Sequence, residues 1–299
     1  MTLIDKEKKI RCPKCNWAPD GQPHWRCTCG KKWNTFETKG KCEKCGIQWQ
    51  DTFCPRCGQS SEHEMWYSDE ISYPVPQPVN HVELERRKAV IESRLAGYGI
   101  EGTRITFLPY LDFDPDEFQP TMEVGRRILI LWAVSNIALN LNEKDEVADW
   151  LKRSMLWDSV SPRERELFAG NTNERALMNF SWQIEAFIVL CWAVNLLDDI
   201  PDLSTSLTDQ ELVGLRKQLP INHDPTEFLA NISYRNKEEI FIENIINELV
   251  TSNLRDMMLS GKKKKLKLDA SISLERHRAL NWLRQFSGIS EWDETDTST

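Results

Sequence analysis

Long apolar runs are missing from this sequence. Nowhere do about 18 apolar residues follow one another, the length that a helix needs to cross a bilayer. The richest stretch, Ile128–Leu141, is interrupted by Ser135, Asn136 and Asn140. The start MTLIDKEKKIRC has no apolar segment of the kind that a secretory signal requires. These absences argue against a membrane protein and a secreted protein, so we expect a cytoplasmic protein with no membrane partner.

Nucleophile motifs and internal repeats are also missing. No serine or cysteine stands in a motif typical of nucleophilic catalysis, and no period of about 20–50 residues recurs. The composition is ordinary for a soluble globular protein, with 40% hydrophobic and 28% charged residues. With 299 residues, the chain is long enough for two domains. The sequence therefore favours a protein that is not an enzyme, but it does not exclude an enzyme.

Cysteine is concentrated at one end of the chain. Eight of the nine cysteines form four closely spaced pairs, Cys12 and Cys15, Cys27 and Cys29, Cys42 and Cys45, Cys54 and Cys57. A Cys-x-x-Cys turn presents two thiolates to one ion, and four thiolates complete a tetrahedral zinc site. Glycine follows three of the pairs, at Gly30, Gly46 and Gly58, where it lets the backbone amides approach the sulfurs. The pattern predicts two metal sites with all eight cysteines as ligands.

Disulfide bonds are the competing interpretation of eight cysteines. They are typical of short secreted chains, whereas paired cysteines in a reducing cytosol indicate metal. Because each ion would be enclosed by four thiolates, with no open position for water, we expect two structural zinc ions. A unit this small cannot stabilise itself by core burial alone, so each ion would supply on the order of 10 kcal/mol of folding free energy.

The pairing of the four cysteine pairs is open. Consecutive pairing, first with second and third with fourth, is favoured because it gives two tandem ribbons. Alternate pairing would give a cross-brace like that of RING-type domains, but the twelve residues between Cys29 and Cys42 are more than such domains leave. His24 could replace a thiolate of the tighter second pair, although a packing role beside Trp25 is favoured. His63, beyond the last pair, is interpreted in the same way.

Three regions follow from the composition. Residues 1–67 form a double zinc-ribbon domain with short extended pieces, in which Trp33 and Phe36 cover a small core and Gly40 turns the chain. Residues 68–81 are a linker whose alternate prolines forbid helix. Residues 82–299 form an all-α domain, and the fold class is therefore mainly α. The run Lys262–Lys265 is expected to be a solvated loop.

Helical periodicity and start signals place the helices of the second domain. The first helix begins near Val82 with apolar Leu84, Val90, Ile91 and Leu95, and glycines stop it. Further signals are a cap at Asn142, capping boxes beginning at Ser161 and Thr208, an Asp-Pro start at Asp224, a helix at 123–141, and long helices at about 237–258 and 272–286.

A few polar side chains in apolar helices are candidates for chemistry. Glu185 lies among apolar neighbours and must find a cation, for which Arg126 or Arg127 is available. A buried ion pair is favoured over a polar pocket. On the last helix, His277, Asn281 and Arg284 share a face on which acid-base chemistry is conceivable. Cys191 is interpreted as an inert core residue.

The helical region resembles the bacterial domain of unknown function 4272 family. The resemblance runs over about residues 83–297 and is carried by the segments RRKAVIESRL, GRRILILWAV, SWQIEAFIVLCWAV and ERHRALNWL, and by the ending EWDETDT. The residues that match best are Arg276, His277, Ala279, Asn281, Trp282, Trp292, Asp293, Asp296 and Thr297. The N-terminal region resembles a double zinc ribbon found in a subset of such proteins. The resemblance implies a helical fold and carries over no catalytic residue.

Charge separates the candidate functions. The net charge is −8, and residues 1–66 carry twelve Lys and Arg against eight Asp and Glu, so the rest carries −12. The favoured hypothesis is a non-enzymatic zinc-binding protein-interaction module, in which the metal-bound unit presents Trp and Lys side chains to a partner and the acidic helical domain docks a second surface. One hypothesis within this class is that the acidic domain neutralises a basic effector, as immunity proteins of toxin systems do. A nucleic-acid binder would use Lys31, Lys32, Lys39, Lys41 and Lys44, with Trp33 and Trp49 stacking on bases. An enzyme would bring together Glu185, Arg126 and His277.

Overall fold

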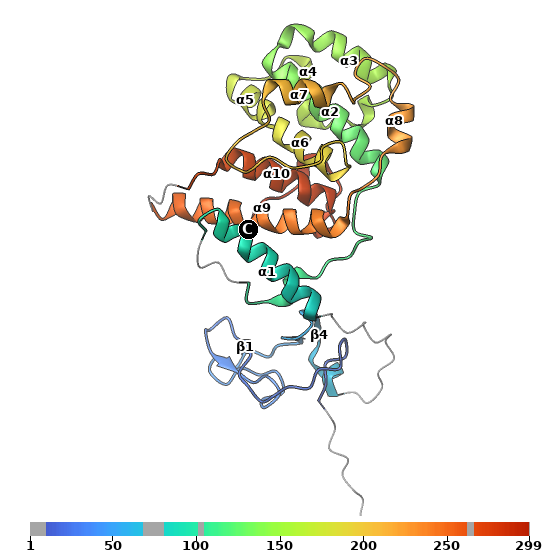
Figure 1. Cartoon of the computed structure of the whole chain (residues 1–299). Coiled ribbons are helices and arrows are strands. Elements are labelled where there is room, and N and C mark those ends of the chain that lie inside the picture. Colours follow the sequence, from blue (N-terminus) through green and yellow to red (C-terminus); the bar gives the residue numbers. More distant parts are fainter. Residues whose placement is uncertain (1–9, 68–80, 101–104, 262–265, 299) are drawn as a thin grey trace, which may run out of the picture. The chain divides into compact units, whose positions relative to one another are not determined.

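The computed structural model describes residues 10–67, 81–100, 105–261 and 266–298 (Figure 1). The charged tail, the proline-rich segment up to residue 80 and the run Lys262–Lys265 lie outside the described residues. Contacts divide the chain into two units. The N-terminal unit is Met1–Ala89 with Ile105–Asp112, and the helical unit is Val90–Arg104 with Phe113–Thr299. The first helix crosses the division, so the units do not coincide with the stretches on either side of the prolines.

Two small antiparallel hairpins build the N-terminal unit. Strand β1 (Trp25–Arg26) pairs with β2 (Lys32–Trp33), and β3 (Asp51–Phe53) pairs with β4 (Ser60–Glu62). An isolated bridge joins Lys41 to Gln48. The turn of each hairpin, and the loop closed by the bridge, contains one cysteine pair. The candidate metal ligands therefore lie at turns that the short strands hold in place.

An aromatic cluster fills the space between the hairpins. Trp25, Trp33, Phe36 and Trp66 are buried together with four of the cysteines. The indole Nε1 of Trp25 donates to the Phe53 carbonyl at 2.7 Å, which ties one hairpin to the other. The predicted core role of Trp33 and Phe36 is confirmed. The segment Ile105–Asp112 adds to this unit through Phe107, whose ring centroid lies 5.7 Å from that of Phe53.

Gly40 turns the chain as the sequence indicated. Its φ of +81° is left-handed, and a Cβ there would lie 2.8 Å from the Trp49 carbonyl oxygen. The amide of Gly40 donates to Thr35, and its carbonyl accepts from Trp49. No side chain fits this close approach, so the glycine fixes where the chain returns toward the third cysteine pair.

The chain is mainly α-helical, as predicted, with 54% of the described residues in helices. The α-helices are α1 (His81–Gly97), α2 (Thr121–Leu139), α3 (Lys144–Arg153), α4 (Pro162–Ala169), α5 (Glu174–Trp182), α6 (Ile184–Ala193), α7 (Asp209–Arg216), α8 (Thr226–Asn231), α9 (Lys237–Leu259) and α10 (Ala270–Leu283). Short 3-10 helices are His63–Tyr67, Leu108–Leu111, Leu141–Glu143, Trp157–Ser159, Phe286–Gly288 and Trp292–Glu294.

Most of the predicted helix starts are confirmed. Capping boxes form at Ser161 and Thr208, and Asp224 accepts from the Thr226 amide at 2.9 Å. The predicted cap at Asn142 is wrong, because the side chain of Asn140 accepts from the Asn142 amide and opens a 3-10 turn instead. Short polar side chains compete for nearby amides, so adjacent asparagines leave the cap ambiguous in sequence.

Helix α1 buries only part of its predicted apolar face. Leu84, Ile91 and Leu95 are buried, but Val82 is 75% exposed and Val90 37% exposed. Val82 lies in the first turn, and Val90 lies one residue off the buried stripe. The predicted first helix is confirmed, and 3.6-residue periodicity places these two valines away from its packed side.

Helices α2 and α6 form the centre of the helical unit. Helix α2 packs against α5 and α6, and α10 packs against both α6 and α9 (Figure 1). Every residue from Glu185 to Ala193 is buried. The stretch Glu174–Ala193 is long and apolar enough to cross a membrane by composition, but 61% of its window is buried in this core. A core helix explains that composition.

Candidate metal centres

All four cysteine pairs lie in turns with the same backbone hydrogen bonds. In the first, the Cys12 amide donates to the Trp17 carbonyl at 2.8 Å, and the Asn16 amide donates back to the Cys12 carbonyl at 2.9 Å. The third and fourth pairs repeat this pattern. The Cys42 amide donates to Ile47 and its carbonyl accepts from Gly46, and the Cys54 amide donates to Gln59 and its carbonyl accepts from Gly58. The second pair has one residue fewer between its cysteines, and each of its two hydrogen bonds spans one residue less. The Cys27 amide donates to the Lys31 carbonyl, and the Gly30 amide donates to the Cys27 carbonyl.

The residue after each pair has a left-handed backbone. Its φ is +85° at Gly30, +75° at Gly46 and +69° at Gly58. The first turn has Asn16 in this position with φ +59°. Asparagine tolerates this region better than other residues with a Cβ. The glycines marked three turns in the sequence, and Asn16 is the fourth marker, which the sequence reasoning missed.

The turns meet as two tetrads of sulfur atoms. Cys12, Cys15, Cys54 and Cys57 form one tetrad, and Cys27, Cys29, Cys42 and Cys45 form the other. In each, the ligand atoms lie within 4.8 Å of one another. The first pair therefore joins the fourth, and the second joins the third. This nested arrangement corrects the consecutive pairing that the sequence favoured, and it differs from the cross-brace as well.

A backbone hydrogen bond between the two ends of the segment agrees with the nesting. The Arg11 amide, beside the first pair, donates at 2.9 Å to the carbonyl of Trp66, which lies beyond the fourth pair. The start of the unit is thus fastened to its end. The second and third pairs, in the middle of the segment, then face each other. The spacing of the cysteines along the chain does not depend on such long-range hydrogen bonds, so it could not predict the pairing.

The sulfur separations suit a tetrahedral ion. Sγ atoms lie 3.8 Å apart between Cys12 and Cys57 and 3.7 Å apart between Cys15 and Cys54. In the other tetrad, the Sγ atoms of Cys27 and Cys45 lie 3.5 Å apart, and those of Cys29 and Cys42 lie 3.6 Å apart. Four sulfurs at about 2.3 Å from a zinc ion stand about 3.8 Å apart. A disulfide would require about 2.05 Å, and all these cysteines are free.

Backbone amides and neighbouring thiols adjust the acidity of the sulfurs. The Cys29 amide, as the largest cause, lowers the pKa of Cys27 to about 6. A hydrogen bond from Cys54 lowers the pKa of Cys12 to about 5, whereas burial raises the pKa of Cys15 to about 12. The sulfurs of this tetrad thus differ in how readily they ionise, and at Cys15 burial is the largest cause that opposes the thiolate. A divalent cation at the centre removes this conflict, because it makes all four thiolates favourable.

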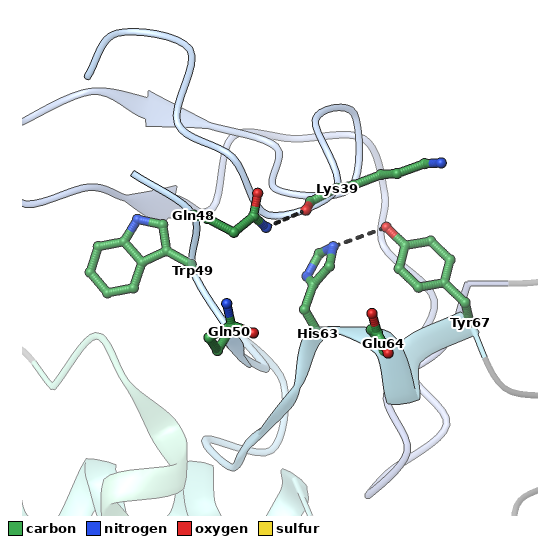
Figure 2. A pocket seen from close by; sticks show the side chains of 7 residues that line it. All are labelled: Lys39, Gln48, Trp49, Gln50, His63, Glu64 and Tyr67. Atoms are coloured by element: carbon green, nitrogen blue, oxygen red, sulfur yellow. Dashed lines mark hydrogen bonds between the residues drawn. The ribbon is translucent and has the colours of Figure 1, made fainter. Parts of the chain in front are cut away.

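The two candidate histidines have other partners. The Nε2 atom of His24 lies 2.7 Å from Asp20 Oδ1, and its ring packs edge-on against Trp25. His63 is buried, its Nδ1 lies 2.6 Å from Thr52 Oγ1, and its Nε2 lies 3.0 Å from the Tyr67 hydroxyl (Figure 2). Burial lowers the pKa of His63. Neither histidine belongs to a tetrad, so their expected packing roles stand.

Two cavities lie in the surface of the N-terminal unit. One of about 620 Å³ is bordered by Trp49, His63, Glu64 and Tyr67 (Figure 2). The second, of about 450 Å³, has Trp25 and Phe53 in its wall. The segment 48–50 lines both cavities, so Trp49 belongs to each. The sequence singled out Trp49 as a stacking residue but not the cavities, which side chains from distant segments form.

Glu185 finds its cation on another helix than expected. Oε2 of Glu185 accepts from Nη2 of Arg276 at 2.8 Å and from Nε at 3.0 Å, and both side chains are fully buried. The predicted buried ion pair is therefore present, but the predicted partners, Arg126 and Arg127, are wrong. Helix α10 packs directly on α6, whereas the arginines of α2 point to other groups.

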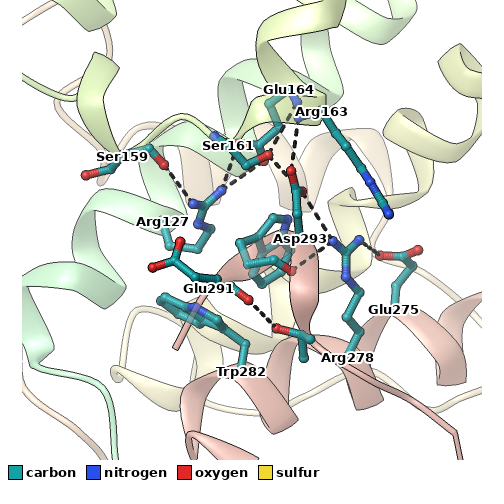
Figure 3. A network of polar contacts seen from close by, with 12 residues as sticks. Arg127, Ser159, Ser161, Arg163, Glu164, Glu275, Arg278, Trp282, Glu291 and Asp293 are labelled. Carbon is teal, nitrogen blue, oxygen red and sulfur yellow. Dashed lines mark hydrogen bonds and ion pairs between the residues drawn. The ribbon is translucent and has the colours of Figure 1, made fainter. Parts of the chain in front are cut away.

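Those arginines have their own carboxylates. Arg127 donates to both oxygens of Glu164 at 2.8 and 2.9 Å and to the Ser159 carbonyl (Figure 3). Arg126 lies 3.6 Å from Glu123 near the surface. His277 bonds to Asn281, and Cys191 is fully buried, which raises its pKa. Glu185, Arg126 and His277 have separate partners and line none of the cavities described here.

Trp292 and Asp293 hold the last part of the chain in place. The Trp292 ring lies between two guanidinium groups, 4.9 Å from Arg127 and 4.6 Å from Arg278. Asp293 accepts from the Ser161 hydroxyl at 2.8 Å and from the Arg163 amide at 3.0 Å, so it caps α4 (Figure 3). The ending EWDETDT was noted in the sequence, but its role depends on residues about 130 positions earlier, as that hydrogen bond shows.

The molecule thus combines a small unit carrying two four-cysteine tetrads with an α-helical unit. The chain belongs to the family described as domain of unknown function (DUF4272), whose model matches residues 87–295. The match covers the helical region, and the cysteine tetrads precede it. No curated protein and no solved structure matches the chain.

Proposed function

We propose that both tetrads hold zinc and that the ions are structural. Four thiolate ligands at tetrahedral spacing suit zinc or iron, and zinc is the common occupant of small hairpin modules with this ligand set. The four sulfurs of each tetrad complete the tetrahedron, so no position remains for water or substrate. The ions therefore stabilise the unit rather than take part in a reaction.

We infer that the stabilised unit serves as a protein-interaction module in the cytoplasm. Trp49 in the walls of two adjoining cavities is the observation that carries this inference. Tryptophan anchors beside pockets dominate binding energy at protein interfaces. Ile47, two residues earlier in the chain, is also apolar and 44% exposed. Because two metal sites fix the loop that carries Trp49, little entropy would be lost when a partner binds.

The acidic balance of the remaining chain favours a basic partner. Residues 67–299 carry −12, from −8 overall and +4 in residues 1–66. Such a field speeds association with cations and repels nucleic acid. This supports the hypothesis of a protein that neutralises a basic effector, in the manner of an immunity protein.

Nucleic-acid binding is the weaker candidate. Of the two tryptophans proposed for base stacking, Trp33 is only 7% exposed and packs in the aromatic core. Lys44 donates to the Cys29 carbonyl, and Lys31 lies 4.0 Å from Glu43. Trp49 alone cannot form the succession of stacking rings that single-strand binding uses.

Affinity capture from the native cell tests the proposal. Wild-type protein should retain a stoichiometric protein partner, and Trp49→Ala should lose it while keeping two zinc ions per chain. Trp17→Ala is the matched control, since Trp17 lines neither cavity. Recovery of nucleic acid with a steep salt dependence would favour the weaker candidate. Equal capture by wild type and Trp49→Ala would contradict the proposed surface.

A further inference from the structure

A cavity of about 450 Å³ lies in the helical unit, bounded by α4, α5 and α10. Ala176, Phe180 and Leu274 form an apolar part of its wall, and Gln183, Glu275 and Arg278 form a polar part. None of these polar residues belongs to the metal sites or to the surface around Trp49. The cavity is large enough for the end of a side chain or a small molecule.

Two acceptor groups in this wall have no hydrogen-bond donor. Gln183 is only 6% exposed, and its Oε1 atom is buried without a partner. The Oε2 atom of Glu275 is likewise buried without a hydrogen bond. Its nearest cation, Nη1 of Arg278, lies 4.0 Å away, too far for a hydrogen bond. Unsatisfied acceptors in a buried site cost free energy, which an incoming donor would recover.

Arg278 does not supply that donor because other groups engage it. Its Nη2 atom donates to the Trp292 carbonyl at 3.2 Å and lies 4.0 Å from Asp293 Oδ1. Its guanidinium also stacks on the Trp292 ring. Figure 3 shows Arg278 between Glu275 and Asp293, held on both sides. The polar part of the wall therefore has hydrogen-bond acceptors that lack a donor.

Charge favours a cation over a neutral donor. The lining includes three carboxylates, Glu166, Glu275 and Asp293, against two guanidinium groups, Arg163 and Arg278. Burial is the largest cause of a raised pKa at Glu275, which shows how weakly its negative charge is compensated. A cation beside this carboxylate would offset the cost of burying it.

We propose that this cavity binds an alkylguanidinium or alkylammonium group, with the cationic head at Glu275 and Gln183 and the stem against Phe180 and Leu274. A guanidinium group has parallel N–H donors that suit two acceptors, and an aliphatic stem suits the apolar wall. The same group occurs in free amines and at the ends of arginine and lysine side chains. The site is independent of the metal ions and of the proposed role of Trp49.

Calorimetric titration of the full-length zinc-loaded protein tests this site. Butylguanidine and the neutral isostere butylurea are the two probes, since they match in shape and differ in charge. We expect butylguanidine to bind at least about tenfold more tightly, a difference of about 1.4 kcal/mol. Equal binding of the two, or no binding of either at millimolar concentration, would overturn the proposal.

Substitutions locate the binding to this cavity. Glu275→Gln keeps the size of the side chain and should weaken butylguanidine binding about tenfold, whereas the exposed Glu146→Gln on α3 should leave it unchanged. Asn179 is exposed at the cavity, so its variants should fold without difficulty. Asn179→Lys should weaken binding and Asn179→Asp should strengthen it. Identical affinities for these two variants would refute the site even if Glu275→Gln failed to fold.

Titration with two peptides identifies the source of the cation. The capped tripeptide Gly-Arg-Gly is compared with Gly-citrulline-Gly, in which the charge is absent. Tighter binding of the arginine peptide than of butylguanidine indicates a basic partner chain. Binding of butylguanidine without the peptide indicates a free small molecule. Both results support the cavity as a cation site. Equal binding of the arginine and citrulline peptides, together with equal binding of butylguanidine and butylurea, contradicts it.

Discussion

The Nε2 atom of His277 lies 3.0 Å from the amide nitrogen of Asn281 and accepts its hydrogen bond. The orientation of Asn281 is set by a chain of donors. Arg284 Nη1 donates to Asn244 Oδ1, and Asn244 Nδ2 donates to Asn281 Oδ1 at 2.8 Å. Asn281 must therefore present its NH₂ group to His277. The imidazole is neutral, with its proton on Nδ1. In a protonated ring, Nε2 would carry a hydrogen and would point it at the NH₂ group of Asn281, which is also a donor.

This arrangement predicts loss of stability in acid. Burial, followed by the charge of Arg255, lowers the pKa of His277 to about 4. The folded state binds fewer protons than the unfolded state, whose histidine pKa is about 6.5. The stabilisation is complete above about pH 6.5 and is lost as the pH falls toward 4, by up to about 3 kcal/mol. Urea unfolding followed by helical circular dichroism at pH 7 and 4.5 measures it.

His277→Gln should reduce this pH dependence, while the exposed His223→Gln should retain it. Both variants are compared with wild type at the same two pH values, so any acid effect on the metal sites is common to all three. An equal loss of stability in wild type and His277→Gln would contradict the assigned role.

Metal analysis of paired cysteine variants tests the nested pairing. Wild-type protein should contain two zinc ions per chain, and Cys191→Ala should keep both because Cys191 lies in the helical core. Cys12→Ser with Cys57→Ser should lose one ion, since both residues belong to one tetrad. Cys12→Ser with Cys27→Ser should lose two. Consecutive pairing predicts the reverse result for these two double variants.

Removal of metal should unfold the N-terminal unit alone. Its buried core is a small aromatic cluster with cysteines, so most of its folding free energy comes from the ions. Hydrogen exchange after treatment with a strong chelator should show loss of protection at β1 to β4 and retained protection in α2, α6 and α10. Addition of zinc should restore the protection. Protected strands in metal-free protein would contradict structural ions.

The buried Glu185–Arg276 pair predicts a large effect of single substitutions. Glu185→Ala leaves a buried guanidinium without its partner and should cost about 3–5 kcal/mol of unfolding free energy. Glu185→Met combined with Arg276→Leu should cost less than Glu185→Ala alone, because neither charge is then left unpaired. Arg126→Ala removes a surface pair and should cost under about 1 kcal/mol. Denaturant unfolding compares the four proteins, and similar losses for Glu185→Ala and Arg126→Ala would contradict the burial argument.

Local signals in the sequence were accurate where the chemistry is local. Capping boxes at Ser161 and Thr208 involve residues three positions apart, and the turns after the cysteine pairs need a glycine or asparagine at one position. Such features depend only on residues a few positions apart, so packing with the rest of the chain does not alter them. The exposure of Val82 and Val90 was not determined in this way, because it depends on which side of α1 is packed.

Contacts between distant residues were not predictable in this way. The sequence showed that Glu185 needs a cation and suggested Arg126 or Arg127 on α2, but packing places Arg276 of α10 beside it. Spacing likewise allowed several pairings of the cysteine pairs. A carboxylate or thiolate in sequence has many possible partners, and only the arrangement of the elements selects one.

The sequence by itself determined that eight cysteines lie in turns suited to holding metal ions and that the rest of the chain is mainly helical, because spacing, periodicity and caps are properties of neighbouring residues. Only the tertiary structure decided that the first turn joins the fourth, that Arg276 neutralises Glu185, and that Gln183 and Glu275 face one cavity. Each of these depends on which helices and hairpins pack together, and the free energy of that packing is shared over the whole fold.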